Sequence, residues 1–153
     1  MTGLFFEEFE VDQVFQHGVT RTVTETDNTL FSTMTLNPQP LHIDHHFAAT
    51  ETEFGQPLVN SLFTLGLMIG ISVHETTLRT TIANLGMTDV NFPHPLYHGD
   101  TVHVETRVIA KRESRSRPEA GIVTFHHQAF NQNNQLVAEC KRNAFMHRKA
   151  GVC

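Results

Sequence analysis

The segment Leu36–His46, LNPQPLHIDHH, concentrates groups that can transfer protons or bind metal ions. Its two prolines reduce the freedom of the backbone, so the side chains around them can be held in place at a lower entropic cost. A neutral imidazole near pH 7 can accept and return a proton, which makes His42 a candidate general acid and base. Asn37, five residues earlier, can orient water but cannot take a proton. Asp44 is the nearest carboxylate and an alternative acid, although its position favours a helix cap.

The histidines of this segment are also potential metal ligands. His42 and His46 are four residues apart and would share one face of a helix. However, the chain has no HExxH pattern, and a helix is expected to begin only after His42. His45 and His46 are expected on a helix surface, and the neighbours His126 and His127 point to opposite faces of a strand. We therefore expect no metal, and without GxGxxG or P-loop patterns we expect no bound nucleotide cofactor.

Short helices are expected to position the segment that carries His42. Residues 24–27 resemble a capping box, and apolar residues at helical spacing predict a helix near 26–34. That helix must stop before Pro38, and the chain is expected to run extended from there to Leu41. Asp44 is expected to cap a second short helix that Gly55 ends.

A long apolar helix is predicted next, from Pro57 to about Glu75. The run PLVNSLFTLGLMIGISV is short for a membrane-spanning helix and contains polar residues, so we expect a helix buried on most of its faces and no membrane segment. Pro57 suits the first turn of this helix. Gly66 and Gly70 would let a sheet approach closely.

The second half of the chain reads as β-structure. Residues rich in β-branched and aromatic types predict four strands, near 82–92, 101–111, 121–130 and 135–145. Together with the long helix they predict a single α+β domain over residues 1–153, in which an antiparallel sheet wraps around the central helix. One helix covers only one face of such a sheet, so the other face and the sheet edge are expected to need a partner, and we predict a homodimer.

Composition excludes several classes of function. The net charge of −5 argues against nucleic-acid binding. Cys140 and Cys153 do not form a disulfide framework or a zinc motif, and the N-terminus has no basic flank of a signal peptide, so we expect a cytoplasmic protein. Nine of the eleven Lys and Arg residues lie at or after Arg107, which offers a local basic patch in an acidic chain.

Several of these stretches together resemble the MaoC-like hydratases, which have the hot-dog fold. The resemblance covers nearly the whole chain and rests on four stretches: Phe5–Phe9, Pro40–Asp44 followed by Phe47-Ala48, Phe54–Asn60, and Gly99–Val102. It implies (R)-type hydration of a trans-2-enoyl-CoA, or the reverse dehydration. The catalytic pair of the family is an aspartate and a histidine on a segment that overhangs the substrate tunnel. The histidine position matches His42, whereas the aspartate position is Asn37 here.

The resemblance also implies how the substrate is held. The N–H of Ser61 matches the family glycine that holds the thioester oxygen, and the family pair His-Gly is Asn60-Ser61 in this sequence. If Asn37 replaces the acid, His42 must move the protons while Asn37 orients water or the imidazole. CoA enters as part of the substrate, and its phosphates could meet basic residues of a polar loop that could equally be only solvated: Lys111, Arg112, Arg115 and Arg117.

Two other functions remain open on the sequence. An acyl-CoA thioesterase on the same fold would place its polar group on or near the central helix, where Asn60 is the candidate. A non-catalytic acyl-CoA binder would have lost the acid. For the substrate, similar chains with the run from Asn37 to His42 suggest a short branched or dicarboxylic acyl group such as mesaconyl.

Overall fold

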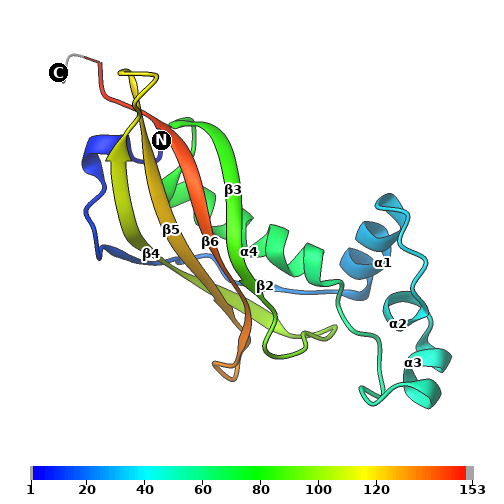
Figure 1. Cartoon of the computed structure of the whole chain (residues 1–153). Coiled ribbons are helices and arrows are strands. Elements are labelled where there is room, and N and C mark those ends of the chain that lie inside the picture. The colour runs from blue at the N-terminus through cyan, green and yellow to red at the C-terminus, as the bar shows by residue number, and fades with distance from the viewer. Residues whose placement is uncertain (1, 151–153) are drawn as a thin grey trace.

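The computed structural model describes residues 2–150 of the chain, which form one curved antiparallel sheet around a central helix (Figure 1). The sheet order is β1-β4-β5-β6-β3, and β2 pairs with β4. The strands are β1 (Val14–Gln16), β2 (Arg21–Thr22), β3 (Thr81–Asn91), β4 (Thr101–Glu113), β5 (Ala120–Phe130) and β6 (Leu136–His147). The helices are the 3-10 helix η1 (Phe6–Glu8), α1 (Glu25–Met34), α2 (Pro40–Ile43), α3 (His45–Glu51) and α4 (Ser61–Thr76). The predicted fold class, the long helix and the four long strands are confirmed.

The sheet encloses α4 because its long strands alternate buried and half-exposed side chains. Val102, Val104 and Val108 of β4 are buried on one face, as the two-residue period of a strand requires. Met68 and Ile71 of α4 are buried in the core, and Met68 is fully covered. Burying such side chains stabilises the fold by roughly 1.5–3 kcal/mol each.

Helices α1 to α3, which span residues 25–51, stand beyond the N-terminal end of α4, and we call them the overhang (Figure 1). The predicted capping box is present, because Thr24 N–H donates to Asp27 Oδ2 at 2.8 Å and Asp27 N–H donates to Thr24 Oγ1 at 3.2 Å. Arg21 adds two hydrogen bonds of 2.8 Å to the same carboxylate. These bonds hold the pKa of Asp27 well below its usual range, so the helix start keeps its negative charge.

Four local expectations are wrong. The chain is not extended up to Leu41, because Pro40 begins the helical turn α2. Helix α3 ends at Glu51 rather than at Gly55. Pro57 does not begin the long helix, which starts at Ser61. Gly66 and Gly70 do not face the sheet, since a Cβ atom at either position would meet no other atom of residues 2–150 within 4 Å.

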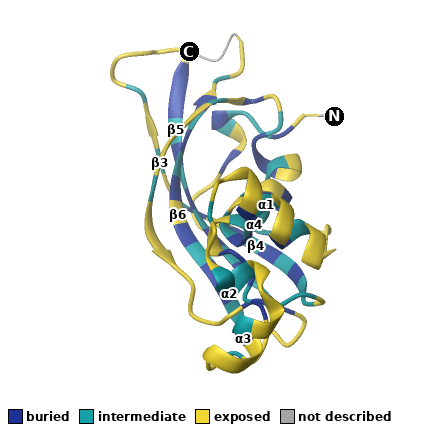
Figure 2. Cartoon of the chain, turned by 90° about the vertical axis from the view of Figure 1, so that its right-hand side faces the viewer, coloured by how far each residue is buried: buried dark blue, intermediate teal, exposed yellow. Residues whose placement is uncertain are grey.

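Strand β3 lies at the end of the sheet order and is largely exposed along its length (Figure 2). Its Leu85 is 52% exposed, and Leu62 on the outer side of α4 is 60% exposed. Residues 2–150 therefore leave the side of α4 that carries Leu62 uncovered. Within residues 2–150, no helix has both the length and the hydrophobicity that crossing a membrane requires.

A chain of polar side chains crosses the core between α4 and β6. Arg142 Nε–H donates to His127 Nε2 at 3.1 Å, so the hydrogen of neutral His127 is on Nδ1 and is donated to Thr106 Oγ1 at 2.8 Å. The Thr106 hydroxyl then donates to His17 Nε2 at 2.9 Å, and His17 Nδ1–H donates to the Glu75 carboxylate. Burial holds the pKa of His127 well below its usual value, so this ring is neutral at pH 7.

Candidate active site

Helix α2 fixes the orientation of His42. Pro40 occupies its first turn, and the N–H of Asp44 closes the turn by donating to the carbonyl of Pro40 at 2.8 Å. The ring of His42 is half-buried, and its Nδ1 lies 2.7 Å from the carbonyl oxygen of Leu58. A carbonyl oxygen can only accept, so Nδ1 carries the hydrogen and Nε2 of the neutral ring has the free lone pair. His42 can therefore act as a base through Nε2.

Asn37 lies at the start of the turn that leads into α2. Leu36 before it has a left-handed backbone with φ of 56°, and the N–H of Asn37 donates to the carbonyl of Ser32 at 2.9 Å. Its Oδ1 accepts a hydrogen bond of 3.1 Å from the N–H of Gln39, which is an Asx-turn. Among the hydrogen bonds of residues 2–150, none joins Asn37 to His42, and none uses the Asn37 amide hydrogens. These hydrogens are available to a water molecule or a ligand.

Asn28 ties the parts of the site together and is not among the site residues predicted from the sequence. This side chain is completely buried. Its Nδ2 donates to the carbonyls of His42 at 3.0 Å and Leu58 at 3.1 Å, while its Oδ1 accepts from the N–H of Asn60 at 2.9 Å. One amide thus links α2, the acceptor of the His42 ring and the start of α4. The only signal in the sequence was an asparagine inside a predicted helix, where its helix propensity is low.

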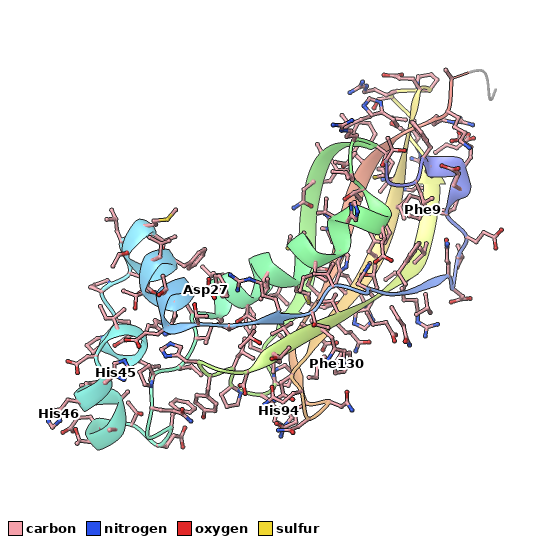
Figure 3. All side chains as sticks on the ribbon, turned by 180° about the vertical axis from the view of Figure 1, so that it is seen from behind. Phe9, Asp27, His45, His46, His94 and Phe130 are labelled. Carbon is pink, nitrogen blue, oxygen red and sulfur yellow. The ribbon has the colours of Figure 1, made fainter. Side chains whose placement is uncertain are left out.

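The first turn of α4 provides backbone donors beside a hollow. Asn60 is the N-cap, and its Oδ1 accepts from the N–H of Leu62 at 3.1 Å. Ser61 is the first helical residue, so its N–H has no acceptor within the helix, and none is found elsewhere in residues 2–150. The hollow has a volume of about 270 Å³, and its lining is mainly apolar: Phe54, Leu58, Val59, Ser61, Thr64, Phe92, Pro93, His94, Pro95, Leu96 and Val137. His94 marks the loop before β4 in Figure 3.

Asn60 and Asp44 are already committed to structural hydrogen bonds. Asn60 is 3% exposed, and besides its cap bond its Nδ2 donates to Ser32 Oγ at 3.3 Å. The Oδ1 of Asp44 accepts from the N–H of Phe47 at 2.9 Å, so Asp44 caps α3 as expected. Among the site residues predicted from the sequence, the structure connects His42 to the start of α4, where Asn60 and Ser61 lie. The connection runs through the Leu58 carbonyl and the Asn28 side chain.

The basic residues predicted to contact CoA are not near His42 in the same chain. They lie at the far end of β4 and in the loop that follows it, whereas the overhang lies beyond the start of that strand (Figure 1). Ten strand residues separate the two ends by roughly 33 Å. Lys111 donates to the carbonyls of Phe6 at 3.1 Å and Phe9 at 2.7 Å, and Arg117 pairs with Glu119 at 2.6 Å. Arg112 and Arg115 are exposed.

His98, in the turn before β4, is a further titratable group close to this network. Asn28 Nδ2 lies 3.0 Å from His98 Nε2, which can only be an acceptor in this contact and competes with the carbonyls of His42 and Leu58 for the two amide hydrogens. Burial lowers the pKa of His98, while the Glu25 carboxylate acts in the opposite direction. The neutral ring is therefore the form expected near pH 7.

Comparison with known proteins agrees with this architecture. The family model described as "MaoC like domain" matches residues 7–129. The chain is 31% identical to β-methylmalyl-CoA dehydratase of Chloroflexus aurantiacus over 90% of its own length, and 28% identical to mesaconyl-CoA hydratase of Cereibacter sphaeroides over 88%. It spans only 38% of the length of each of these curated relatives.

A solved structure shows the same fold. A Mycobacterium tuberculosis protein described as a double hotdog fold superposes with a TM-score of 0.87 at 21% identity, over 99% of this chain and 46% of that one. The curved antiparallel sheet around α4 is thus the hot-dog arrangement expected from the sequence. Because the family model covers most of the chain and the fold agrees, this protein belongs to the family of MaoC-like domains.

Proposed function

We propose that this chain adds water to a trans-2-enoyl-CoA to give a 3-hydroxyacyl-CoA, or catalyses the reverse dehydration. The observation that carries the proposal is the fixed tautomer of His42. Its Nδ1–H is held by the Leu58 carbonyl at 2.7 Å, which leaves Nε2 free to act as a base, and Leu58 itself is three residues before Ser61, whose N–H is a free donor. Leu58 and Ser61 both line the apolar hollow.

Hydration needs a base and a stabiliser for negative charge, and these residues supply both. Nε2 of His42 takes a proton from water as the water oxygen bonds to C3 of the enoyl group. The electrons of the C2=C3 bond move toward the thioester oxygen, where the Ser61 N–H at the start of α4 stabilises the developing charge. C2 then takes the proton back from Nε2. Positioned proton transfer of this kind contributes about 10²- to 10⁴-fold to a rate.

Asn37 orients the attacking water in this proposal. The family aspartate could share the proton transfer, whereas an amide can only donate and accept hydrogen bonds. The free amide hydrogens of Asn37, on a turn held by Leu36 and Gln39, suit that smaller role. His42 is then the single acid and base of the reaction.

For the substrate we propose a short branched or dicarboxylic acyl-CoA. The two relatives named above act, by their names, on methylmalyl-CoA and mesaconyl-CoA. The hollow of about 270 Å³ next to Ser61 suits a short acyl group rather than a long chain. The free N–H of Ser61, which lines this hollow, can donate to the thioester oxygen of an acyl-CoA bound there. The buried and doubly hydrogen-bonded Asn60 argues against the thioesterase alternative, which needs this side chain for chemistry.

We also propose that the working unit is a homodimer formed through β3. The exposed edge of β3, with Leu85 beside it, and the exposed Leu62 side of α4 both suit a second copy of the chain. Light scattering after size exclusion should give twice the mass of one chain, and Leu85→Lys should shift the protein toward the monomer. A monomeric wild-type protein would contradict this assembly.

Such a dimer would bring basic residues of the second subunit to the phosphates of CoA. A two-fold axis pairs β3 with its copy in antiparallel fashion, so the far end of the partner's sheet comes to the end of this sheet where α4 begins. Arg112 and Arg115 of the partner subunit would then lie on the side where CoA enters. We keep these two exposed arginines as the candidates for its phosphates.

A cytoplasmic location fits the same proposal. Cys140 is a free thiol inside the core, and burial raises its pKa to about 11, so it is an unreactive side chain of the kind common in reducing compartments.

Mass spectrometry of the protein incubated with linear, branched and dicarboxylic enoyl-CoAs tests the proposed activity. A gain of one water on the acyl-CoA, with no release of free thiol, is the expected result, and the class that reacts identifies the substrate. Release of free thiol would support a thioesterase instead. Saturable binding without turnover would support an acyl-CoA binder.

A further inference from the structure

Three potential metal ligands lie close together, two on the overhang and one in the turn before β4. Glu25 is the first residue of α1, His45 is the first residue of α3, and His98 precedes β4. One ligand atom from each lies within 4.8 Å of the others. The Oε1 of Glu25 is 2.9 Å from Nε2 of His45, and the rings of His45 and His98 lie 6.2 Å apart between centroids. Figure 3 labels His45 on the overhang.

We propose that Glu25, His45 and His98 bind a divalent transition metal ion, with zinc as the expected occupant. Two imidazole nitrogens and one carboxylate oxygen are ligands that zinc accepts, and a water molecule would complete the four-coordinate shell. Bonds of about 2.0–2.2 Å to zinc require ligand atoms closer together than 4.8 Å. Glu25 and His45 are exposed side chains on helix ends, so rotation about their own bonds can supply that adjustment.

The surroundings of His98 leave a nitrogen lone pair for the ion. Asn28 Nδ2 carries two hydrogens, but three acceptors lie within 3.1 Å of it: the carbonyls of His42 and Leu58, and Nε2 of His98. When the two carbonyls take both hydrogens, Nε2 of His98 is left without one. A metal ion that binds this nitrogen displaces the contact between Asn28 and His98, whereas the two carbonyl bonds that hold α2 in place remain.

Two effects oppose a cation at this place, and both are weak. The His45–Glu25 ion pair must open, but its side chains are 59% and 62% exposed, so solvent screens it. The N-terminal ends of α1 and α3 carry partial positive charge, yet such dipole effects are small beside metal–ligand bonds. The ion would tie α1, α3 and the loop before β4 together around the turn that carries His42.

Zinc titration by calorimetry tests this site without any substrate. The purified chain is first treated with EDTA, and the wild-type protein should then bind one zinc ion per chain. Replacing the zinc by Co²⁺ should give a visible absorption band typical of four-coordinate cobalt. The variants His45→Ala and Glu25→Gln should each lose about tenfold or more in zinc affinity while their circular dichroism stays unchanged. His46→Ala is the matched control, because His46 is an exposed neighbour on α3 outside the cluster.

Equal affinity of the His46→Ala control and the wild type, with weakened binding in both cluster variants, supports the site. Absence of zinc binding by the wild-type chain would overturn the proposal. Unchanged binding in His45→Ala and Glu25→Gln would also overturn it, because the zinc would then sit elsewhere. The sequence alone predicts no metal site, because Glu25, His45 and His98 are far apart in the chain.

Discussion

The substitution Asn28→Asp tests the network that holds the site. It keeps Oδ1, which accepts from the Asn60 N–H, but it replaces the NH₂ group with an oxygen that faces three acceptors: the His42 carbonyl at 3.0 Å, the Leu58 carbonyl at 3.1 Å and His98 Nε2 at 3.0 Å. Each lost bond to a buried group costs about 1–3 kcal/mol. The Leu58 carbonyl keeps its bond from the His42 ring, so the larger penalty falls on the His42 carbonyl. We expect the free energy of unfolding to fall by about 3 kcal/mol at pH 7.

The loss of unfolding free energy in Asn28→Asp should increase as the pH rises. Burial and the two carbonyls raise the pKa of the introduced carboxyl group above its unfolded value of about 3.9. A group whose folded pKa is raised contributes most stability below the unfolded pKa and loses it as the pH rises through the folded pKa. The deficit relative to wild type should therefore be smallest near pH 4 and largest at pH 7. In Asn28→Ala, which has no ionisable group, the deficit should not change with pH.

Urea unfolding followed by circular dichroism, at a series of pH values, measures both quantities. Thr29→Ala is the control, because Thr29 is an exposed neighbour on α1 and its loss should change stability by less than about 0.5 kcal/mol. If Asn28→Asp is as stable as wild type at pH 7, or if its deficit is the same at pH 4 and pH 7, Asn28 does not hold the site as described.

Three further changes test other parts of the structure. Asn37→Asp restores the acid of the family pair and should speed hydration of simple enoyl-CoAs, measured by loss of the enoyl absorbance; a clear loss of rate would mean that the amide is adapted to the substrate. Because the folded pKa of His127 is lowered, the unfolded chain takes up this proton first, and wild-type stability should fall below about pH 6.5 by up to ~1.4 kcal/mol per pH unit from this residue. His127→Gln should flatten that part of the urea-derived stability profile, and an unchanged slope would assign the acid sensitivity to other groups. Gly3→Ala places a Cβ 2.5 Å from the backbone oxygen of Thr76, so it should cost about 1–3 kcal/mol in urea unfolding; stability equal to wild type would show that the N-terminal segment shifts freely.

The strands and the cap of α1 could be predicted because their signals are local. The capping residues Thr24 and Asp27 lie three positions apart, and the four long strands each carry their own run of β-branched and aromatic residues. The sequence predicts the start of α4 too early, at Pro57 rather than at Ser61. Pro57 is compatible with a first turn, but the buried Asn60 provides the actual cap through its bond to Leu62.

The connections within the site could not be predicted in this way. Asn28 meets groups 14, 30 and 32 residues away in the chain, and no local pattern shows such contacts. The cluster of Glu25, His45 and His98 also forms only when α1, α3 and the turn before β4 pack together. Likewise, the sequence of the basic loop does not show that this loop lies at the opposite end of β4 from the overhang.

The turnover of His42→Ala on the reactive enoyl-CoA tests the central claim most directly. The account predicts a loss of about 10²- to 10⁴-fold in kcat, because Nε2 of His42 moves the proton that water gives up. Circular dichroism and urea unfolding should remain close to wild type, because within residues 2–150 the half-buried ring makes a single hydrogen bond, to the carbonyl of Leu58. A folded His42→Ala protein that hydrates its substrate at the wild-type rate would contradict the account.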